Sequence, residues 1–284
     1  MAIFTNQATL SYNNTTTTSN VVTGEILEVL SAAKNAVDDE YRFNDTVTYV
    51  ISIVNTGAAP FNGLTISDDL GAYTVAGVTR TPLTYVAGSL AYYANGVLQS
   101  SATAVAGPPL VITGINVPAG GNAVVIYQAR VNEFAPLASG STITNNATVS
   151  GAGLSTPIDV SDTITIADAT QLSITKGLTP ATVAENGQLT YTFTIQNTGN
   201  IPAVATDNIT VTDLFNPILE NITVALNGTV LTEGPQYTYD EVTGLFQTVA
   251  GVITVPAATY TQDPVTGQWN IVPGVTVLTV TGTV

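Results

Sequence analysis

Two lysines are the residues of this chain whose type and spacing point most directly to chemistry. They are the only lysines in 284 residues, and they stand at equivalent places in two sequence repeats. Lys34 and Lys176 are each followed by a short β-prone segment that ends in an acid, Asp68 or Asp213. Surface lysines usually scatter, so the matched positions predict two sites of the same design.

An asparagine is the third member expected at each site. Asn145 lies on the last β-prone segment of the first repeat, with apolar residues at alternate positions, so its side chain should point into the core. Asn6 holds the matching place near the N-terminus. The two expected sets are Lys34, Asp68 and Asn145, and Lys176, Asp213 and Asn6 of another copy.

An amine, a carboxyl group and a side-chain amide that converge in an apolar core predict an isopeptide bond. Burial disfavours charged forms, so a buried lysine becomes a neutral nucleophile and a buried aspartic acid becomes a proton donor. The amine would attack the asparagine carbonyl, Asp68 or Asp213 would polarise that carbonyl and shuttle protons, and ammonia would leave. A lysine–aspartate ion pair beside a hydrogen-bonded asparagine is the simpler alternative.

The elements that position these residues belong to an internal repeat. Residues 46–57 (TVTYVISIVNTG) match residues 188–199 (QLTYTFTIQNTG), and the interval from Lys34 to Asn55 equals that from Lys176 to Asn197. Short segments rich in Val, Ile, Thr and Tyr alternate with turn residues throughout both copies, a pattern typical of β-sandwiches. We expect an all-β protein of two tandem immunoglobulin-like β-sandwiches with an N-terminal donor strand.

The last strand of the repeat is displaced along the chain. The first copy ends with residues 143–150 (ITNNATVS), whereas the sequence stops at Val284 before a second such segment. Residues 4–11 (FTNQATLS) match it at five positions. The spacing from this segment to the next repeat lysine is nearly the same at the N-terminus as between the two copies. The order is therefore last strand, complete domain, incomplete domain.

An incomplete sandwich has an open sheet edge, and a free strand has no stable fold alone. Insertion of the strand into another copy would satisfy both, as in donor-strand complementation. The donor residues are Phe4, Asn6, Ala8 and Leu10, of which the last three should point into the acceptor core. Donor and acceptor lie at opposite ends of the chain, so the assembly should be a head-to-tail filament. A fold-back onto the same chain and a closed ring are the alternatives.

The predicted boundaries follow from these matches. They are a donor strand at 1–12, a flexible linker at 13–24, a complete immunoglobulin-like sandwich at 25–152, a linker at 153–168 and an incomplete sandwich at 169–284.

Composition excludes several classes of function. The net charge of −15 disfavours binding to nucleic acid and anionic membranes. The chain has no Cys and no His, which excludes disulfides, the usual zinc sites and Ser–His or Cys–His catalysis.

No segment reaches the ~18 apolar residues of a membrane span, and the N-terminus shows no signal-peptide pattern. We expect no cofactor. Acidic groups at 38–40 and 240–241 would suit Ca²⁺, but solvated loops explain them better.

The repeated Lys…Asn-Thr-Gly…Asp pattern, with the Asn145 strand, resembles the DUF11 repeat domain of bacterial and archaeal surface proteins. It is also similar to the isopeptide-bearing sandwiches of Gram-positive pilins and adhesins. This resemblance implies an extracellular, cell-surface structural protein rather than an enzyme acting on external substrates. We expect a pilin-like filament subunit whose partners are other copies of itself. A monomeric adhesin or ligand-binding module is the alternative.

Overall fold

The computed structural model describes residues 2–284 and confirms the all-β class. Within those residues the one helical element is a short 3-10 turn, η1 (Ala205–Asp207). The chain forms two compact units, one comprising the chain up to residue 136 with residues 142–165, the other residues 137–141 and 166–284. Residue 1 of the predicted donor segment lies outside the described residues.

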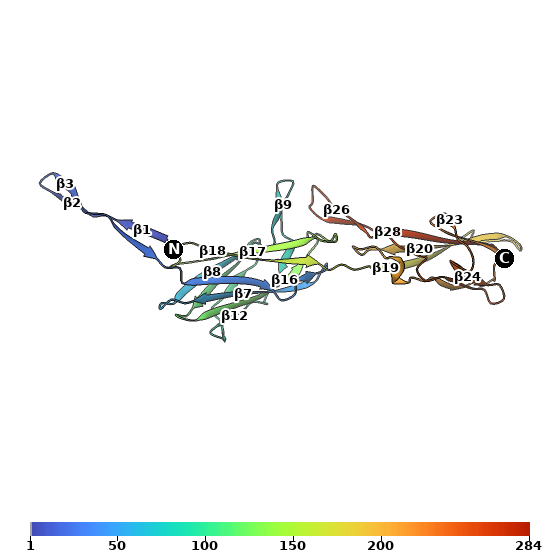
Figure 1. Ribbon diagram of the computed structural model, residues 1–284, viewed down its shortest axis with the longest axis horizontal. Coiled ribbons are helices and arrows are strands. Elements are labelled where there is room, and N and C mark those ends of the chain that lie inside the picture. The colour runs from blue at the N-terminus through green and yellow to red at the C-terminus, as the bar shows by residue number, and fades with distance from the viewer. Residues whose placement is uncertain (1) are drawn as a thin grey trace. The chain divides into compact units, whose positions relative to one another are not determined.

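The first unit contains a sandwich of two sheets (Figure 1). One sheet holds, in spatial order, β13 (Val97–Gln99), β12 (Ala91–Ala94), β16 (Asn122–Val131), β7 (Thr46–Asn55) and β5 (Leu30–Ala36), with β11 (Leu83–Tyr85) beside β16. The other holds β14 (Thr103–Val105), β15 (Leu110–Val117), β8 (Phe61–Asp68), β17 (Thr142–Ser150), β18 (Ile158–Ile166) and β6 (Glu40–Tyr41). A separate hairpin joins β9 (Tyr73–Val75) to β10 (Val78–Arg80).

The strict alternation of buried side chains in the long strands creates the core of this sandwich. In β7, every second residue from Val47 to Ile53 is buried, and β16 follows the same pattern from Ala123 to Val131. Such a period of two places one face of each sheet inside and the other in solvent. The inward positions include Tyr49 and Tyr127, which pair across the two strands with stacked rings.

The second unit repeats this design with fewer strands. One sheet has the order β19 (Leu172–Thr179), β20 (Gln188–Asn197), β28 (Gly274–Thr283), β22 (Glu220–Leu226) and β23 (Thr229–Val230). A second has the order β21 (Thr212–Leu214), β25 (Leu245–Thr248) and β24 (Tyr237–Asp240), and β26 (Thr259–Gln262) pairs with β27 (Trp269–Val272). The pairings of Lys34 with Ile51 and of Lys176 with Phe193 show that both units share one register.

The repeated Asn-Thr-Gly motif closes the end of a central strand in each unit. The buried Asn55 amide donates to the carbonyls of Ala59 at 2.8 Å and Pro118 at 2.9 Å, and its oxygen accepts the Gly57 N–H at 2.9 Å. Asn197 makes the same three kinds of contact in the second unit. One side chain thus satisfies three backbone groups that the ending strand leaves unpaired.

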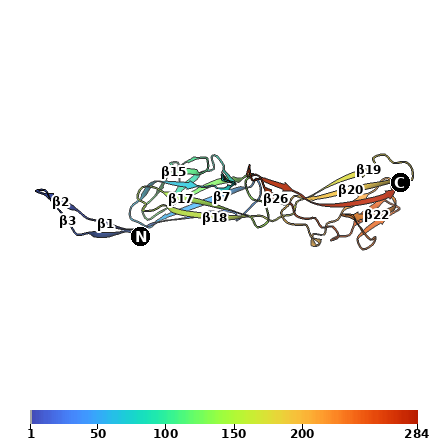
Figure 2. The same ribbon diagram turned by 90° about the horizontal axis from the view of Figure 1, so that it is seen from above.

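The two units differ at the sheet edge beyond the strand that carries the aspartate. In the first unit, β17 pairs with β8 on one side and with β18 on the other; β17 and β18 run side by side in Figures 1 and 2. In the second unit, β21 pairs with β25 and with no other strand among residues 2–284. Every residue of β19 is exposed. The second unit therefore has an open edge where the first has β17.

The N-terminal segment forms a hairpin, which differs from the predicted free strand and linker. Strand β1 (Ala2–Asn6) pairs with β4 (Val22–Ile26), and β2 (Thr9–Tyr12) pairs with β3 (Thr15–Thr18). Asn13 and Asn14, both at positive φ, reverse the chain. The Thr-rich tract predicted as a flexible linker is β-prone and returns along the donor strand.

The predicted linker at 153–168 also contains a strand. Its residues from Ile158 to Ile166 form β18, which pairs with β17 in the first sandwich. Alternate polar side chains of β18 face solvent, Asp162 is half-buried, and Ile164 and Ile166 are buried. The first sandwich therefore extends beyond the predicted end at residue 152.

Candidate isopeptide site

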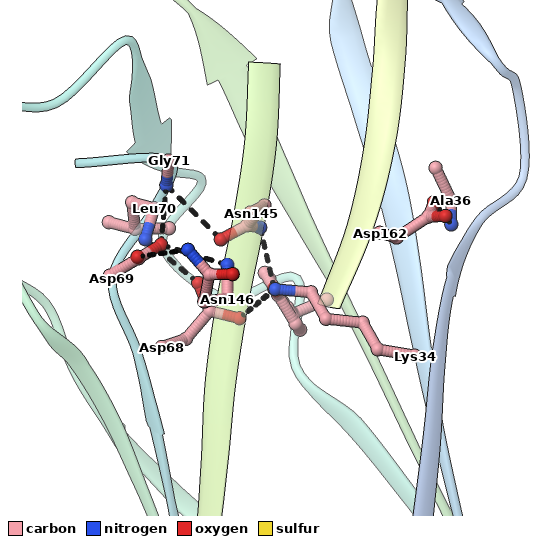
Figure 3. A network of polar contacts seen from close by, with 10 residues as sticks. Lys34, Ala36, Asp68, Asp69, Leu70, Gly71, Asn145, Asn146 and Asp162 are labelled. Carbon is pink, nitrogen blue, oxygen red and sulfur yellow. Dashed lines mark hydrogen bonds and ion pairs between the residues drawn. The ribbon is translucent and has the colours of Figure 1, made fainter. Parts of the chain in front are cut away.

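The first predicted site assembles within one sandwich. Lys34 on β5 is 4% exposed, and its Nζ lies 2.6 Å from Oδ2 of Asp68 at the end of β8 (Figure 3). Because β5 and β8 belong to different sheets, this ion pair bridges the sandwich. The Nζ also lies 4.9 Å from the centroid of the Tyr49 ring. An aliphatic and aromatic core thus encloses the amine and the carboxylate.

Asn145 reaches the same place from β17, as the alternation predicted. It is fully buried, its amide donates to the Tyr127 hydroxyl at 3.3 Å, and its Oδ1 accepts the backbone N–H of Gly71 at 3.2 Å. The Tyr127 hydroxyl in turn donates to Oδ2 of Asp68. Lys34, Asp68 and Asn145 therefore share one hydrogen-bonded network, part of which is drawn in Figure 3.

Tyr127 is a member of the site that sequence reasoning missed. Its hydroxyl connects Asp68 to Asn145, so a proton can pass between the carboxylate and the leaving amide through one side chain. A tyrosine at an inward position of a central strand looks like an ordinary core residue. The available signal was its place on β16, the strand immediately before β17, opposite Tyr49 of β7.

The roles at the asparagine also differ from the predicted ones. Asp68 was expected to polarise the Asn145 carbonyl, whereas the donor to that oxygen is the Gly71 N–H. A backbone donor there stabilises the negative charge that develops on the oxygen when an amine attacks. Asp68 instead contacts the amine and the Tyr127 hydroxyl, positions from which a carboxylate accepts and returns protons.

Burial sets the protonation states in this network. Loss of hydration lowers the pKa of Lys34, and the attraction of Asp68, Asp69 and Asp162 offsets only part of that effect. Burial also raises the pKa of Tyr127 well above its usual value, so the phenol stays protonated and donates to Asp68. A lowered lysine pKa increases the fraction of neutral, nucleophilic amine at neutral pH.

The second predicted site is half assembled. Lys176 on β19 forms an ion pair with Asp213 on β21, but the lysine side chain is 40% exposed. Its Nζ lies 4.2 Å from the centroid of the Tyr191 ring, with Phe193 and Phe215 also within cation–π distance. The chain thus provides the amine and the acid of the second set, with the lysine open to solvent and the Asp213 side chain 18% exposed.

A groove lies beside this ion pair. Its volume is about 360 Å³, and its lining includes Ile174, Lys176, Phe193, Val211 and Asp213. The groove runs between β19 and β21, the strands that correspond to β5 and β8 of the first unit. In the first unit Asn145 and the other inward side chains of β17 occupy the matching space.

The two sites also differ at the tyrosine. Tyr127 pairs with Tyr49 in the first unit, and Val280 pairs with Tyr191 at the equivalent register of the second. Valine carries no hydroxyl, so the second site has no counterpart of the bridging phenol.

The predicted donor residues lie on the N-terminal hairpin. Phe4 and Asn6 are on β1 and Leu10 is on β2, with Ala8 at the junction between them, and all four side chains are exposed. Asn6 pairs with Val22 of β4. The structure therefore joins the first predicted set in one chain and presents the third member of the second set on an exposed hairpin.

Two further features carry no site. Among residues 2–284, no three acidic side chains lie close enough together to hold a metal ion. Asp240, one of the acids considered for Ca²⁺, accepts hydrogen bonds from the Thr243 hydroxyl and the Val242 N–H, which lower its pKa.

No helix in the described part of the chain has the length and apolar character needed to traverse a bilayer.

Comparisons with known proteins give similarities of fold. The chain is similar to BcpA, the major pilin subunit of Bacillus cereus, with 11% identity over 95% of this chain and 73% of that one, at a TM-score of 0.38. It is similar to the pilus backbone RrgB of Streptococcus pneumoniae, with 10% identity over 86% and 55%, at a TM-score of 0.34. A collagen-binding domain from a Staphylococcus aureus adhesin aligns with 50% of this chain and 99% of its own, at 10% identity and a TM-score of 0.30.

No protein-family model matches the chain, and no curated protein sequence matches it. The resemblance to the DUF11 repeat therefore stays a prediction.

Proposed function

We propose that the chain is the structural subunit of an extracellular filament that polymerises head-to-tail by donor-strand complementation. The observation that carries this proposal is the unpaired edge of β21. This edge borders a groove whose lining includes the Lys176–Asp213 ion pair. The first sandwich fills the matching place with β17, and the N-terminal segment repeats the residues of β17.

The first sandwich gives the register of the proposed contact. There Ala147 pairs with Asp68 and Val149 with Ile66. The equivalent pairing sets Ala8 of one copy opposite Asp213 of the next, and Leu10 opposite Val211. The Asn6 side chain then projects toward Lys176, as Asn145 projects toward Asp68 and Tyr127 in the first site.

Burial of exposed apolar surface provides the driving force. Leu10 is 61% exposed on the hairpin and Ile174 is 53% exposed on the groove wall, and docking would cover both. Each buried leucine- or isoleucine-sized side chain contributes about 1.5–3 kcal/mol. The strand also supplies partners for the free N–H and C=O groups of β21, which are otherwise paired with water.

The proposed contact is heterologous because donor and acceptor are different segments of the chain. Each added subunit presents a new free acceptor or a new free donor, and such a contact builds an open filament where its rotation does not close into a ring.

Covalent locking follows the docking step. The Lys176 amine attacks the Asn6 side-chain carbon, a bond forms between Nζ and Cγ, and the bond from Cγ to Nδ2 breaks. The amine gives up a proton, and the amide nitrogen leaves as ammonia, so the reaction needs no oxidant or added co-substrate. Within the first sandwich, Lys34 and Asn145 form the same bond in one chain. The protein is its own substrate and turns over nothing else.

Electron microscopy of the purified full chain tests this proposal. Wild-type protein is expected to form filaments that resist boiling in detergent as a ladder of covalent multimers. Leu10→Asp places a charge in the acceptor core and is expected to abolish both the filaments and the covalent ladder. Leu98→Asp is the matched control, because Leu98 is 63% exposed on a different hairpin. The proposal is contradicted if Leu10→Asp forms the same filaments as wild type. It is also contradicted if the wild-type protein stays monomeric, as expected for an adhesin module.

A further inference from the structure

The N-terminal hairpin repeats the pairing of β17 and β18, as well as the residues of β17. Thr5 pairs with Thr23 in the hairpin, and Thr144 pairs with Thr163 in the first sandwich. One step along, Asn6 pairs with Val22, at the place where Asn145 pairs with Asp162. The hairpin and the β17–β18 ribbon therefore share one register around the reactive asparagine.

A compensating exchange of volume at the next inward pair supports this match. In the first sandwich, Ile143 pairs with Ile164, and both are buried in the core. In the hairpin, Phe4 takes the first position and Gly24 the second. A Cβ on Gly24 would lie 2.5 Å from the Phe4 ring, so the ring occupies the space of the missing side chain. The Phe4–Gly24 pair thus has one large and one minimal side chain where the Ile143–Ile164 pair has two of intermediate size.

Strand β18 contributes buried side chains and hydrogen bonds to the first sandwich. It places Ile164 and Ile166 in the core, and its Thr165 N–H donates to the Asp39 carbonyl at 2.8 Å. Its Asp162 accepts the Ala36 N–H of β5 at 2.6 Å. Strand β18 therefore contacts the free edge of β5, the strand that carries Lys34.

The second sandwich lacks a counterpart of β18 as well as of β17 within residues 2–284. Strand β19 is exposed along its whole length, including the apolar Leu172, Ile174 and Leu178. A single inserted strand would pair with β21 and leave much of this surface uncovered. Two strands in the order of the first sandwich would cover it.

We propose that the donor is the whole hairpin of residues 2–26, which enters the acceptor of the next copy as a preformed two-stranded ribbon. In the register given above, residues 8–10 lie along the edge that contains β21, and β1 continues beyond it. The return strands β3 and β4 lie on the outer side of β2 and β1, where they close the sandwich toward β19. This inference rests on the proposed head-to-tail assembly. It explains why the Thr-rich return strand is paired before docking: less chain remains to be ordered when subunits meet.

The Phe4–Gly24 pair provides the test, in the full chain. Gly24→Ile forces a side chain against the Phe4 ring and should slow filament elongation by about tenfold or more, the order expected for an overpacked contact of this size. Phe4→Ile combined with Gly24→Ile recreates the Ile143–Ile164 pair and should restore elongation. Thr23→Ile is the matched control, since Thr23 neighbours Gly24 on the opposite face. Unchanged melting of the two sandwiches shows that each variant still folds.

The outcomes separate this inference from the proposed function. Loss of elongation in Gly24→Ile with recovery in the double variant supports ribbon insertion. Normal elongation of Gly24→Ile, together with failure of Leu10→Asp, overturns ribbon insertion and leaves a single donor strand. Failure of the double variant to recover also overturns it, because the two strands then do not pack as β17 and β18 do. Normal elongation of Leu10→Asp overturns strand exchange itself.

Discussion

Lys34 combines burial with an ion pair, and the two act on its charge in opposite directions. Burial lowers its pKa, while Asp68 at 2.6 Å favours the ammonium form. A buried ion pair is weak evidence of stability, because the cost of removing two charges from water rivals their attraction. The proposed amide removes both the lysine charge and that cost, so the arrangement is better understood as a reactive precursor than as a stabilising contact.

The first prediction at this scale concerns the mass and stability of the first sandwich. The native chain should weigh less than its sequence by one ammonia from the Lys34–Asn145 bond, in peptides that join β5 to β17. Asn145→Ala should show the full mass and lose about 4–5 kcal/mol of stability, by analogy with a cross-link that closes a loop of roughly 100 residues. Intact-mass measurement and thermal melting check both effects. Asn146→Ala, on the exposed face of β17, should keep the bond.

The same bond should form faster as pH rises after refolding. Protonated Lys34 has no lone pair to attack with, and its lowered pKa means that the neutral amine becomes abundant at a lower pH than for a free lysine. The cross-linked fraction against time, followed by mass at several pH values, measures this. A rate that is independent of pH would contradict attack by the neutral amine.

The third residue-scale prediction uses the difference between the two sites. Tyr127→Phe removes the hydroxyl that joins Asp68 to Asn145 and should slow the first bond by about tenfold or more, as expected for loss of a proton-transfer partner. The intersubunit bond at Lys176 should keep its rate, because Val280 holds the equivalent position. Equal slowing of both bonds would show that the variant acts through folding.

At the scale of elements, the periodicity of the sequence predicted the parts of the fold that depend on burial. Strands β7 and β20 alternate cleanly, and their Asn-Thr-Gly ends have one geometry, so the repeat and the lysine positions followed from spacing. Strand β18 was assigned to a linker because only two of its nine side chains are fully buried and no repeat copy follows β28. Tyr127 was missed because a strand pattern marks a tyrosine as inward-facing without showing what its hydroxyl contacts.

The element-scale prediction tests the register of donor on acceptor. In the first sandwich Thr148 pairs with Ser67, which sets Thr9 of one copy opposite Thr212 of the next. Residues opposite each other in adjacent strands have Cβ atoms about 4.5–5.5 Å apart, close to disulfide reach. Since the chain has no cysteine, Thr9→Cys with Thr212→Cys should give a disulfide ladder that reductant dissolves.

The experiment needs a background without the proposed isopeptide ladder, so both cysteines are placed in Lys176→Ala. Thr9→Cys with Thr210→Cys is the control, because Thr210 lies on the same face two positions away. A stronger ladder from the control would mean that the donor docks two residues out of the proposed register.

At the scale of the whole molecule, the position of donor and acceptor at opposite ends of the chain makes polarity testable. Leu10→Asp disables only the donor. Ile174→Asp disables only the acceptor, and because Ile174 is already exposed on the groove wall, the charge should not unfold the sandwich. Each variant alone should stay monomeric.

Mixed in equal amounts, the two variants should form dimers and nothing larger. The intact hairpin of Ile174→Asp enters the intact groove of Leu10→Asp, and the complex then has only a disabled donor and a disabled acceptor left. Light scattering after size exclusion would measure this mass. A hairpin that completed its own chain would give no dimer on mixing, whereas a face-to-face contact between identical surfaces would give dimers of one variant alone. Dimers restricted to the mixture therefore distinguish a polar, head-to-tail contact from both alternatives.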